Sequence, residues 1–176
     1  MAELRVALAG NPNAGKTTVF NALTGSRQHV GNWPGKTVEC KSGSFRHRGH
    51  EVEVIDLPGT YSLTAYSTEE VIARDFILWD EPEAVVVVVD ACNLERNLYL
   101  VVQILELQAR LILAVNMIDR AEALGYQVDV DALSAHLGGA PVVPMVATRD
   151  EGLEGLKDAI ANVAVERART IELEQI

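Results

Sequence analysis

The sequence is poor in cysteine and contains no long apolar run. Its 176 residues include two cysteines, Cys40 and Cys92, which lie far apart in the chain. Two cysteines are too few for a disulfide scaffold, and their scarcity fits a reducing compartment. No apolar run approaches the roughly 18 residues of a membrane-spanning helix, and the N-terminal run is too short for a signal peptide. The sequence therefore predicts a soluble chain.

Positive charge is also scarce. Lysine and arginine number 15 against 25 acidic residues, which gives a net charge of −10. Such a surface repels phosphate backbones, so it argues against sequence-blind nucleic-acid binding. It does not exclude a small anionic ligand, because backbone N–H groups can bind one locally. The length favours one domain, and a chain of this size can bury about 70% of its unfolded surface.

Strand and helix patterns alternate along the chain. Continuous apolar runs predict strands at 4–10, 51–59, 84–90, 111–116 and 141–147, and amphipathic or capped segments predict helices at 16–25, 67–79, 93–107, 130–138 and 151–168. Two alternating segments within 38–54 predict a hairpin, with Arg46, His47 and Arg48 in a solvated tip. The pattern is typical of an α/β fold with a doubly wound, mostly parallel sheet of six to seven strands and one antiparallel edge strand.

The strongest motif follows the first predicted strand. "GNPNAGKT", from Gly10 to Thr17, matches GxxxxGK[ST] between a strand and a helix. Gly10 and Gly15 permit backbone shapes in which N–H groups converge on phosphates. Lys16 would reach the terminal phosphates, and the Thr17 hydroxyl would bind Mg²⁺. The alternative is a plain glycine turn that precedes a helix.

A second motif follows the strand at 51–59. "DLPG" runs from Asp56 to Gly59. Asp56 is placed to hold Mg²⁺, most simply through a water molecule, and the N–H of Gly59 can face a γ-phosphate. A DxxG turn is common by itself, but its place after a phosphate loop makes it significant.

Two further motifs concern the base. "NMID" contains Asn116 and Asp119, and the Asp119 carboxylate could accept hydrogen bonds from N1–H and the 2-amino group of guanine. Adenine lacks that pair of donors, so the site would discriminate between the bases. Asn116 would tie this loop to the phosphate loop, and the N–H of Ala147 in "VAT" could contact the guanine carbonyl. The alternative for NMID is a helix start capped by asparagine or aspartate.

The order and spacing of these motifs resemble the Ras-like P-loop GTPase fold over roughly residues 4–165. Three positions depart from the common pattern. Met117 replaces the usual lysine of NKxD, Thr60 stands where a water-orienting glutamine is usual, and Val146 replaces a common serine. Together with "VGNWPGKTVE", "GNPNAGKTTVFNALTG" and "DLPGTYSL", these departures resemble the G domain of the ferrous iron transport protein B family.

The resemblance implies a binding site for GTP or GDP with Mg²⁺ and K⁺. Mg²⁺ would be held by Thr17, Thr37 and Asp56, and K⁺ by Asn13 and the carbonyls of Gly31 and Trp33. Catalytic roles would fall to Asn13, Lys16, Thr37 and Gly59. The nucleotide would contact Gly10, Asn11, Pro12, Asn13, Ala14, Gly15, Lys16, Thr17, Thr18, Gly35, Lys36, Thr37, Asp56, Leu57, Pro58, Gly59, Asn116, Met117, Asp119, Val146, Ala147 and Thr148.

Asn13, Thr37 and Trp33 each carry a specific expectation. Asn13 supplies a neutral hard oxygen to K⁺, or alternatively only shapes its loop. Thr37 senses the triphosphate, so hydrolysis would release its segment, or alternatively it only begins an edge strand. Trp33 need not belong to the core and is expected to be loosely held until the segment closes. The residue that orients the attacking water stays unassigned.

The resemblance also places the domain in a larger protein. It implies a G domain at 1–168 and a tail at 169–176, before a helical domain and a membrane permease, on the cytoplasmic side of the bacterial inner membrane. The expected function is GTP hydrolysis that regulates or powers ferrous iron uptake, with no nucleic-acid partner and with oligomerisation open. A slow nucleotide-dependent switch is the second hypothesis, and an ATPase or kinase, disfavoured by NMID, is the third.

Overall fold

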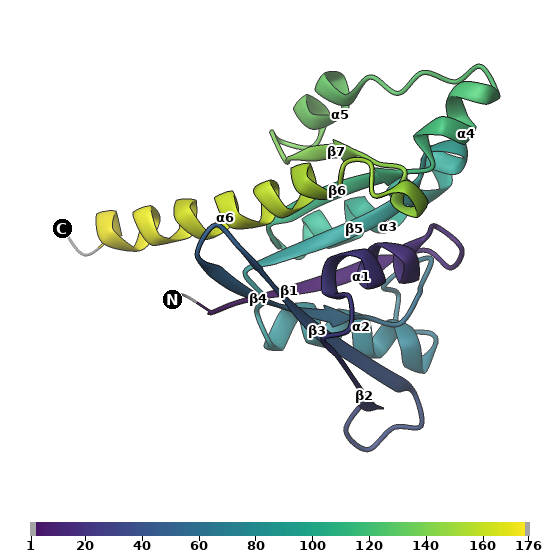
Figure 1. The fold of residues 1–176 in the computed structure, drawn as a ribbon. Helices are drawn as coiled ribbons and strands as arrows, with labels where there is room; N and C mark the ends of the chain where they lie inside the picture. Colours follow the sequence, from purple (N-terminus) through teal and green to yellow (C-terminus); the bar gives the residue numbers. More distant parts are fainter. Residues whose placement is uncertain (1–2, 175–176) are drawn as a thin grey trace.

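The computed structural model describes residues 3–174 and contains one seven-stranded sheet (Figure 1). The strand order across the sheet is β2-β3-β4-β1-β5-β6-β7. Strands β4, β1, β5, β6 and β7 run parallel, and β3 is antiparallel to both β2 and β4. The strands are β1 Glu3–Gly10, β2 Gln28–Asn32, β3 Glu39–His47, β4 His50–Asp56, β5 Ala84–Asp90, β6 Leu111–Asn116 and β7 Val142–Pro144. The predicted fold class is confirmed.

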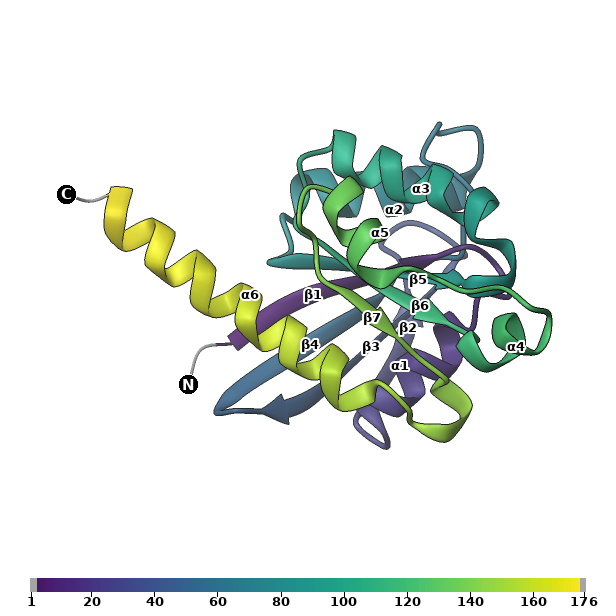
Figure 2. The same ribbon diagram turned by 90° about the horizontal axis from the view of Figure 1, so that it is seen from above.

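Helices cover both faces of the sheet. They are α1 Lys16–Thr24, α2 Thr68–Trp79, α3 Leu94–Glu106, α4 Ile118–Ala123, α5 Val130–His136 and α6 Leu153–Glu174, with short 3₁₀ turns η1 Ala91–Asn93 and η2 Ala147–Arg149. Figure 2 shows α1 and α6 on one face and α2, α3 and α5 on the other. None of the helices in 3–174 is long and apolar enough to span a membrane.

The central strands form the core because both of their faces are covered. Val86 and Val88 of β5 pack with α1 and α6, whereas Val85 and Val87 pack with α2 and α3. All four side chains are at most 1% exposed, as the two-residue alternation of a strand requires when each face meets a helix. This arrangement fixes the carboxyl ends of β1, β4, β5 and β6 at one edge of the sheet.

Several element boundaries differ from the sequence-based expectation. The edge strand β2 was not predicted, because its residues are all exposed and show no apolar alternation. Strand β7 is shorter than predicted, since it ends at Pro144 and Val146 pairs with Glu151 in an isolated antiparallel bridge. Helix α6 continues to Glu174, so much of the predicted tail at 169–176 is helical where the structure describes it.

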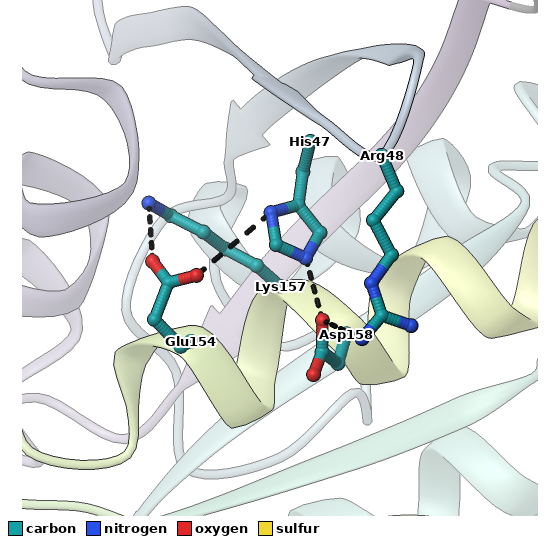
Figure 3. Close-up of polar contacts among 5 residues, drawn as sticks. All are labelled: His47, Arg48, Glu154, Lys157 and Asp158. Atoms are coloured by element: carbon teal, nitrogen blue, oxygen red, sulfur yellow. Dashed lines mark hydrogen bonds and ion pairs between the residues drawn. The ribbon is translucent and has the colours of Figure 1, made fainter.

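The expectation of a solvated hairpin tip is wrong for His47, whereas Arg48 is exposed as expected but also pairs with α6. Figure 3 shows both side chains facing α6. The Nε2 atom of His47 lies 2.6 Å from Oδ1 of Asp158, and Nη2 of Arg48 lies 3.1 Å from the same oxygen. Because the His47 side chain is only 15% exposed, the tip is a docked contact and not a free turn. We call His47, Arg48 and Asp158 the hairpin clamp.

Candidate functional site

The predicted motif residues converge at the carboxyl edge of the parallel strands. The register pairs Leu8 of β1 with Asp56 of β4, and Asp90 of β5 with Asn116 of β6. The loops that follow these strands therefore lie side by side, at the edge where parallel α/β sheets bind ligands. Figure 1 shows this edge at the right, where the loop between β1 and α1 turns back.

The loop from Gly10 to Gly15, which we call the phosphate loop, has two left-handed residues. Gly15 has φ +91°, and a Cβ added there would lie 2.2 Å from Nδ2 of Asn116. Asn13 has φ 69°, a conformation that asparagine tolerates better than most residues. Asn13 therefore does shape the loop, and its exposed side chain also remains free to reach a ligand.

Asn11 is the most unusual polar residue of the phosphate loop. It is 4% exposed, and neither polar atom of its amide has a hydrogen-bond partner within residues 3–174. A buried amide without partners costs free energy, so such a group is rare in a folded protein. Both atoms are buried, so a polar ligand or water would reach them only if the loop changed conformation.

Lys16 and Asp56 form an ion pair across the site. Nζ of Lys16 contacts Oδ1 of Asp56, and both side chains are largely buried. Burial raises the pKa of Asp56 above its ordinary value, and the charge of Lys16 opposes that rise. The N–H of Leu57 donates to the carbonyl of Leu8 at 2.9 Å, which fixes the start of DLPG beside β1. The structure thus brings together the lysine and the aspartate that the motifs predicted.

Asn116 joins the phosphate loop, the NMID loop and the loop after β7. The sequence predicted the link between the phosphate loop and NMID. Its Nδ2 donates to the carbonyl of Ala14 at 3.2 Å, and its Oδ1 accepts the N–H of Ala147 at 3.0 Å. The residue is 4% exposed, so both bonds are protected from water. The predicted role of the Ala147 N–H toward a base is therefore corrected, because that donor is already used. Thr148, the next residue of η2, is exposed.

Asp119 lies at the start of α4 with its carboxylate partly open. Its side chain is 41% exposed, and Oδ2 lies 3.3 Å from Nη2 of Arg149. Met117 caps the helix with φ 64°, another left-handed position. Arg149 was not among the predicted site residues. No motif spacing links it to Asp119, which is 30 positions away in the numbering, and only the folded loops bring the two together.

The end of DLPG packs against the phosphate loop. A Cβ added to Gly59 would meet Pro12 at 3.5 Å, and the N–H of Thr60 donates to the carbonyl of Gly10 at 3.2 Å. Thr60 is 5% exposed. Its N–H is thus already engaged, which weakens Thr60 as a candidate to orient an attacking water.

The segment 31–37 lies apart from the phosphate loop. Figure 1 places the connection between β2 and β3 at the bottom, away from the loop at the right. Gly31 lies opposite Cys40 in the β2–β3 ladder, and the carbonyl of Trp33 accepts the N–H of Lys36 at 2.9 Å. Gly35, Lys36 and Thr37 are exposed.

Trp33 differs from the expectation of a loosely held side chain. Its ring packs edge-on against Phe76 of α2, with centroids 5.6 Å apart, and it belongs to the margin of the core. The indole Nε1 is buried and has no partner within residues 3–174. The segment is therefore held by an aromatic contact in this conformation.

The donor set fits Mg²⁺ better than it fits the whole predicted K⁺ site. The Thr17 hydroxyl is exposed at the start of α1, and the Asp56 carboxylate lies beside Lys16, so hard oxygens suited to Mg²⁺ face this edge. The side-chain oxygen of Asn13 suits a monovalent cation. The carbonyls of Gly31 and Trp33 lie in the β2–β3 connection, and the segment would have to move for them to join Asn13.

Comparisons with known proteins agree with this arrangement. The model of the family described as ferrous iron transport protein B matches residues 4–160. The chain is 54% identical over 164 residues to the Fe(2+) transporter FeoB of Escherichia coli strain K12. This match covers 91% of this chain but 21% of that protein. The corresponding protein of Salmonella typhimurium strain LT2 is 55% identical, with the same coverage. The chain thus spans about a fifth of the length of these curated relatives.

Solved structures show the same relationship. The FeoB G domain of Methanococcus jannaschii is 48% identical, with a TM-score of 0.82 over 93% of this chain and 98% of that chain. The GDP form of the cytosolic domain of T. maritima FeoB is 48% identical, with a TM-score of 0.88 over 93% of this chain and 64% of that chain. The chain belongs to the ferrous iron transport protein B family and corresponds to its G domain.

Proposed function

We propose that this domain binds GTP and hydrolyses it to GDP and phosphate. The observation that carries the proposal is the two-way hydrogen bonding of Asn116, which joins the phosphate loop, NMID and the loop after β7 into one site. A ligand that contacts both a phosphate-binding loop and a base-recognition loop must carry a phosphate and a base, as a nucleotide does. The GDP form of the T. maritima relative supports guanine as the base.

The chain's own residues divide the work of phosphoryl transfer. Lys16, at the N-terminus of α1, supplies positive charge to the terminal phosphates, and the α1 N–H groups add their dipole. Asp119 accepts from guanine N1–H and the 2-amino group. The N–H of Thr148 replaces that of Ala147 as the donor to the guanine carbonyl, since Ala147 is bound to Asn116.

Two cations complete the proposal. Mg²⁺ held by Thr17 and Asp56, with Thr37 in the closed segment, would neutralise phosphate charge. K⁺ held by Asn13 would add charge where the transition state builds it up. Thr37 and the carbonyls of Gly31 and Trp33 would join the site only after segment 31–37 leaves Phe76, so the proposal keeps the closing step that the sequence led us to expect.

The proposed biological role follows from the relatives. The curated relatives are named Fe(2+) transporters, and this chain covers 21% of their length. We therefore propose that hydrolysis in this domain regulates or powers ferrous iron uptake by a permease elsewhere in a longer protein. The cytoplasmic side of the inner membrane is the corresponding location.

The decisive experiment compares steady-state phosphate release in KCl and NaCl. We expect release in KCl to be at least about tenfold faster, because one positioned charge donor contributes on the order of 10²–10³ to such reactions. Equal rates in the two salts would eliminate the potassium claim, and no GTP hydrolysis in either salt would contradict the enzyme proposal.

Asn13 needs two variants because it also shapes the loop. Asn13→Gly keeps the left-handed conformation and removes the side-chain oxygen, whereas Asn13→Ala removes the oxygen and adds strain. A cation ligand predicts that both variants lose the KCl advantage and that Asn13→Gly still binds nucleotide. If Asn13→Gly keeps the advantage, loop shape is the whole role of Asn13.

A slow nucleotide-dependent switch is the second candidate. It is favoured by Thr60, which replaces the usual glutamine and whose N–H donates to Gly10. A single-turnover rate that equals the rate in buffer alone would favour the switch over the enzyme.

A further inference from the structure

The base-side aspartate has a partner that the motifs do not predict. Nη2 of Arg149 lies 3.3 Å from Oδ2 of Asp119, and Nε of Arg149 lies 3.3 Å from Oε1 of Glu151. The guanidinium is thus held between one carboxylate at the start of α4 and one from its own turn. We propose that Arg149 is a positioning residue for base recognition, which holds the Asp119 carboxylate in register for guanine. This inference rests on the proposed guanine-nucleotide function.

The loop that carries Arg149 has a fixed shape. The N–H of Val146 donates to the carbonyl of Glu151 at 3.0 Å, and the N–H of Glu151 donates back at 3.2 Å. Asp150 is left-handed with φ 55°, and Gly152 has φ +82° with Pro144 so close that an added Cβ would meet its carbonyl at 2.3 Å. Arg149 therefore projects from a turn closed by paired hydrogen bonds and is not on a free loop.

Three contacts join the loop after β7 to the segment 116–119, which carries Asp119. Ala147 N–H donates to Asn116 Oδ1 at 3.0 Å, and Ile118 N–H donates to the carbonyl of Met145 at 3.2 Å. The Arg149–Asp119 pair is the third contact, at the rim, where both side chains are about half exposed. The inner contacts fix the backbones, so the outer pair acts on the orientation of the Asp119 side chain.

The pair is compatible with bound guanine. An ionised carboxylate offers about four lone-pair sites, and Arg149 takes one of them on Oδ2. Two donors on the base can still be accepted. A charge-assisted contact from a planar guanidinium restrains the carboxylate, which lowers the ordering cost when two base donors must be met together. A base with one donor gains less from this restraint.

Arg149 also supplies a cation where the NMID motif lacks one. Met117 occupies the position of the usual lysine, so this motif has no cationic arm at its second residue. Within residues 3–174, the ion pairs of Asp119 include Arg149, which comes from the loop after β7. The base side of the site therefore has a cation on the loop after β7 and none at the second residue of NMID.

The test measures binding of a fluorescent N-methylanthraniloyl GDP and its displacement by GDP, IDP and ADP. IDP lacks the 2-amino group, so the ratio of GDP to IDP affinity reports the two-donor contact. For Arg149→Ala we expect about fivefold weaker GDP binding, seen mainly as faster dissociation, and a GDP-to-IDP ratio about threefold smaller, in the range of one exposed charge-assisted contact.

Two further variants and a double-mutant cycle make the test more specific. Arg149→Lys keeps the charge and should recover part of the ratio. Arg120→Ala is the control, because Arg120 is exposed on α4 and its Nη1 lies 3.8 Å from the Met117 sulfur, not from Asp119. Arg120→Ala should keep both the GDP affinity and the GDP-to-IDP ratio within twofold of the wild type. In an Asp119→Asn background, Arg149→Ala should add no further loss.

The outcomes separate this inference from the proposed function. If the wild type does not prefer GDP to ADP, the proposed base recognition fails. If it does and Arg149→Ala keeps both the affinity and the GDP-to-IDP ratio within twofold, the positioning role is overturned. Equal losses for GDP, IDP and ADP would overturn it too, since they would indicate damage to the loop. Tighter GDP binding would show that Arg149 competes with the base.

Discussion

At the scale of single residues, Asn116 connects three segments of the candidate site. Its side chain contacts the loops that follow β1 and β7 while its backbone ends β6. Gly15 makes this possible, because only a residue without Cβ leaves room for the Asn116 amide. The motif residues of the site are therefore interdependent, and their spacing in sequence reflects one shared hydrogen-bond pattern.

Gly15→Ala should destroy this pattern, and Gly125→Ala is its matched control. Both glycines have positive φ, +91° and +82°, so alanine is strained at either position by about 1 kcal/mol. Only at Gly15 would the new Cβ lie 2.2 Å from Asn116, whereas at Gly125 nothing lies within 4 Å. We expect Gly15→Ala to lose about 2 kcal/mol more unfolding free energy, because buried hydrogen bonds break.

Urea unfolding and GDP titration measure the two effects. Gly125→Ala should keep GDP affinity, and Gly15→Ala should lose it. Equal destabilisation by the two substitutions, with GDP binding intact in both, would show that Asn116 does not depend on Gly15.

At the scale of elements, the β3–β4 hairpin links the nucleotide edge to α6. Its strands begin next to segment 31–37 and end at Asp56, and its tip reaches α6 through the hairpin clamp (Figure 3). The sequence pattern predicts the hairpin but gives no sign that His47 at its tip is docked. The docking partner lies more than 100 positions away, and local patterns carry no information about such a contact.

A double-mutant cycle on the hairpin clamp should show measurable coupling. We expect His47→Ala and Asp158→Ala to be coupled by about 1 kcal/mol, since the pair is short, networked with Arg48 and partly buried. The control pair is Arg46 and Glu51, 3.5 Å apart and 61% and 36% exposed, for which we expect about 0.3 kcal/mol or less. Coupling that is equal in the two cycles would mean that the clamp is an ordinary surface contact.

At the scale of the whole molecule, the site occupies one edge of the sheet and α6 leaves from another side. The helix spans 22 residues, or roughly 33 Å at 1.5 Å per residue, and Figure 2 shows it running past the sheet. Segment 31–37 is attached at the far edge through β2, with its Trp33 on Phe76. Closure on a nucleotide would thus move segment 31–37, at the β2 edge of the sheet, relative to the central strands.

Trp33 should report this movement in a Trp79→Phe variant, which removes the second tryptophan, 78% exposed. Adding a non-hydrolysable GTP analogue with Mg²⁺ and K⁺ should shift Trp33 emission relative to GDP, because Trp33 leaves Phe76 when Thr37 approaches the phosphates. Thr37→Ala should abolish the shift. Identical spectra with the two nucleotides would contradict closure.

The sequence by itself determined the fold class and the parallel strands, and it predicted that Lys16, Asp56 and Asn116 would lie at one edge of the sheet. These follow from short-range rules: apolar runs, glycine conformations and helix starts are set by neighbours in the chain. The tertiary structure decided the edge strand β2, the docked hairpin tip, the use of the Ala147 N–H and the Arg149–Asp119 pair. These depend on which loops meet across the sheet, and that meeting is fixed by the packing of the whole core.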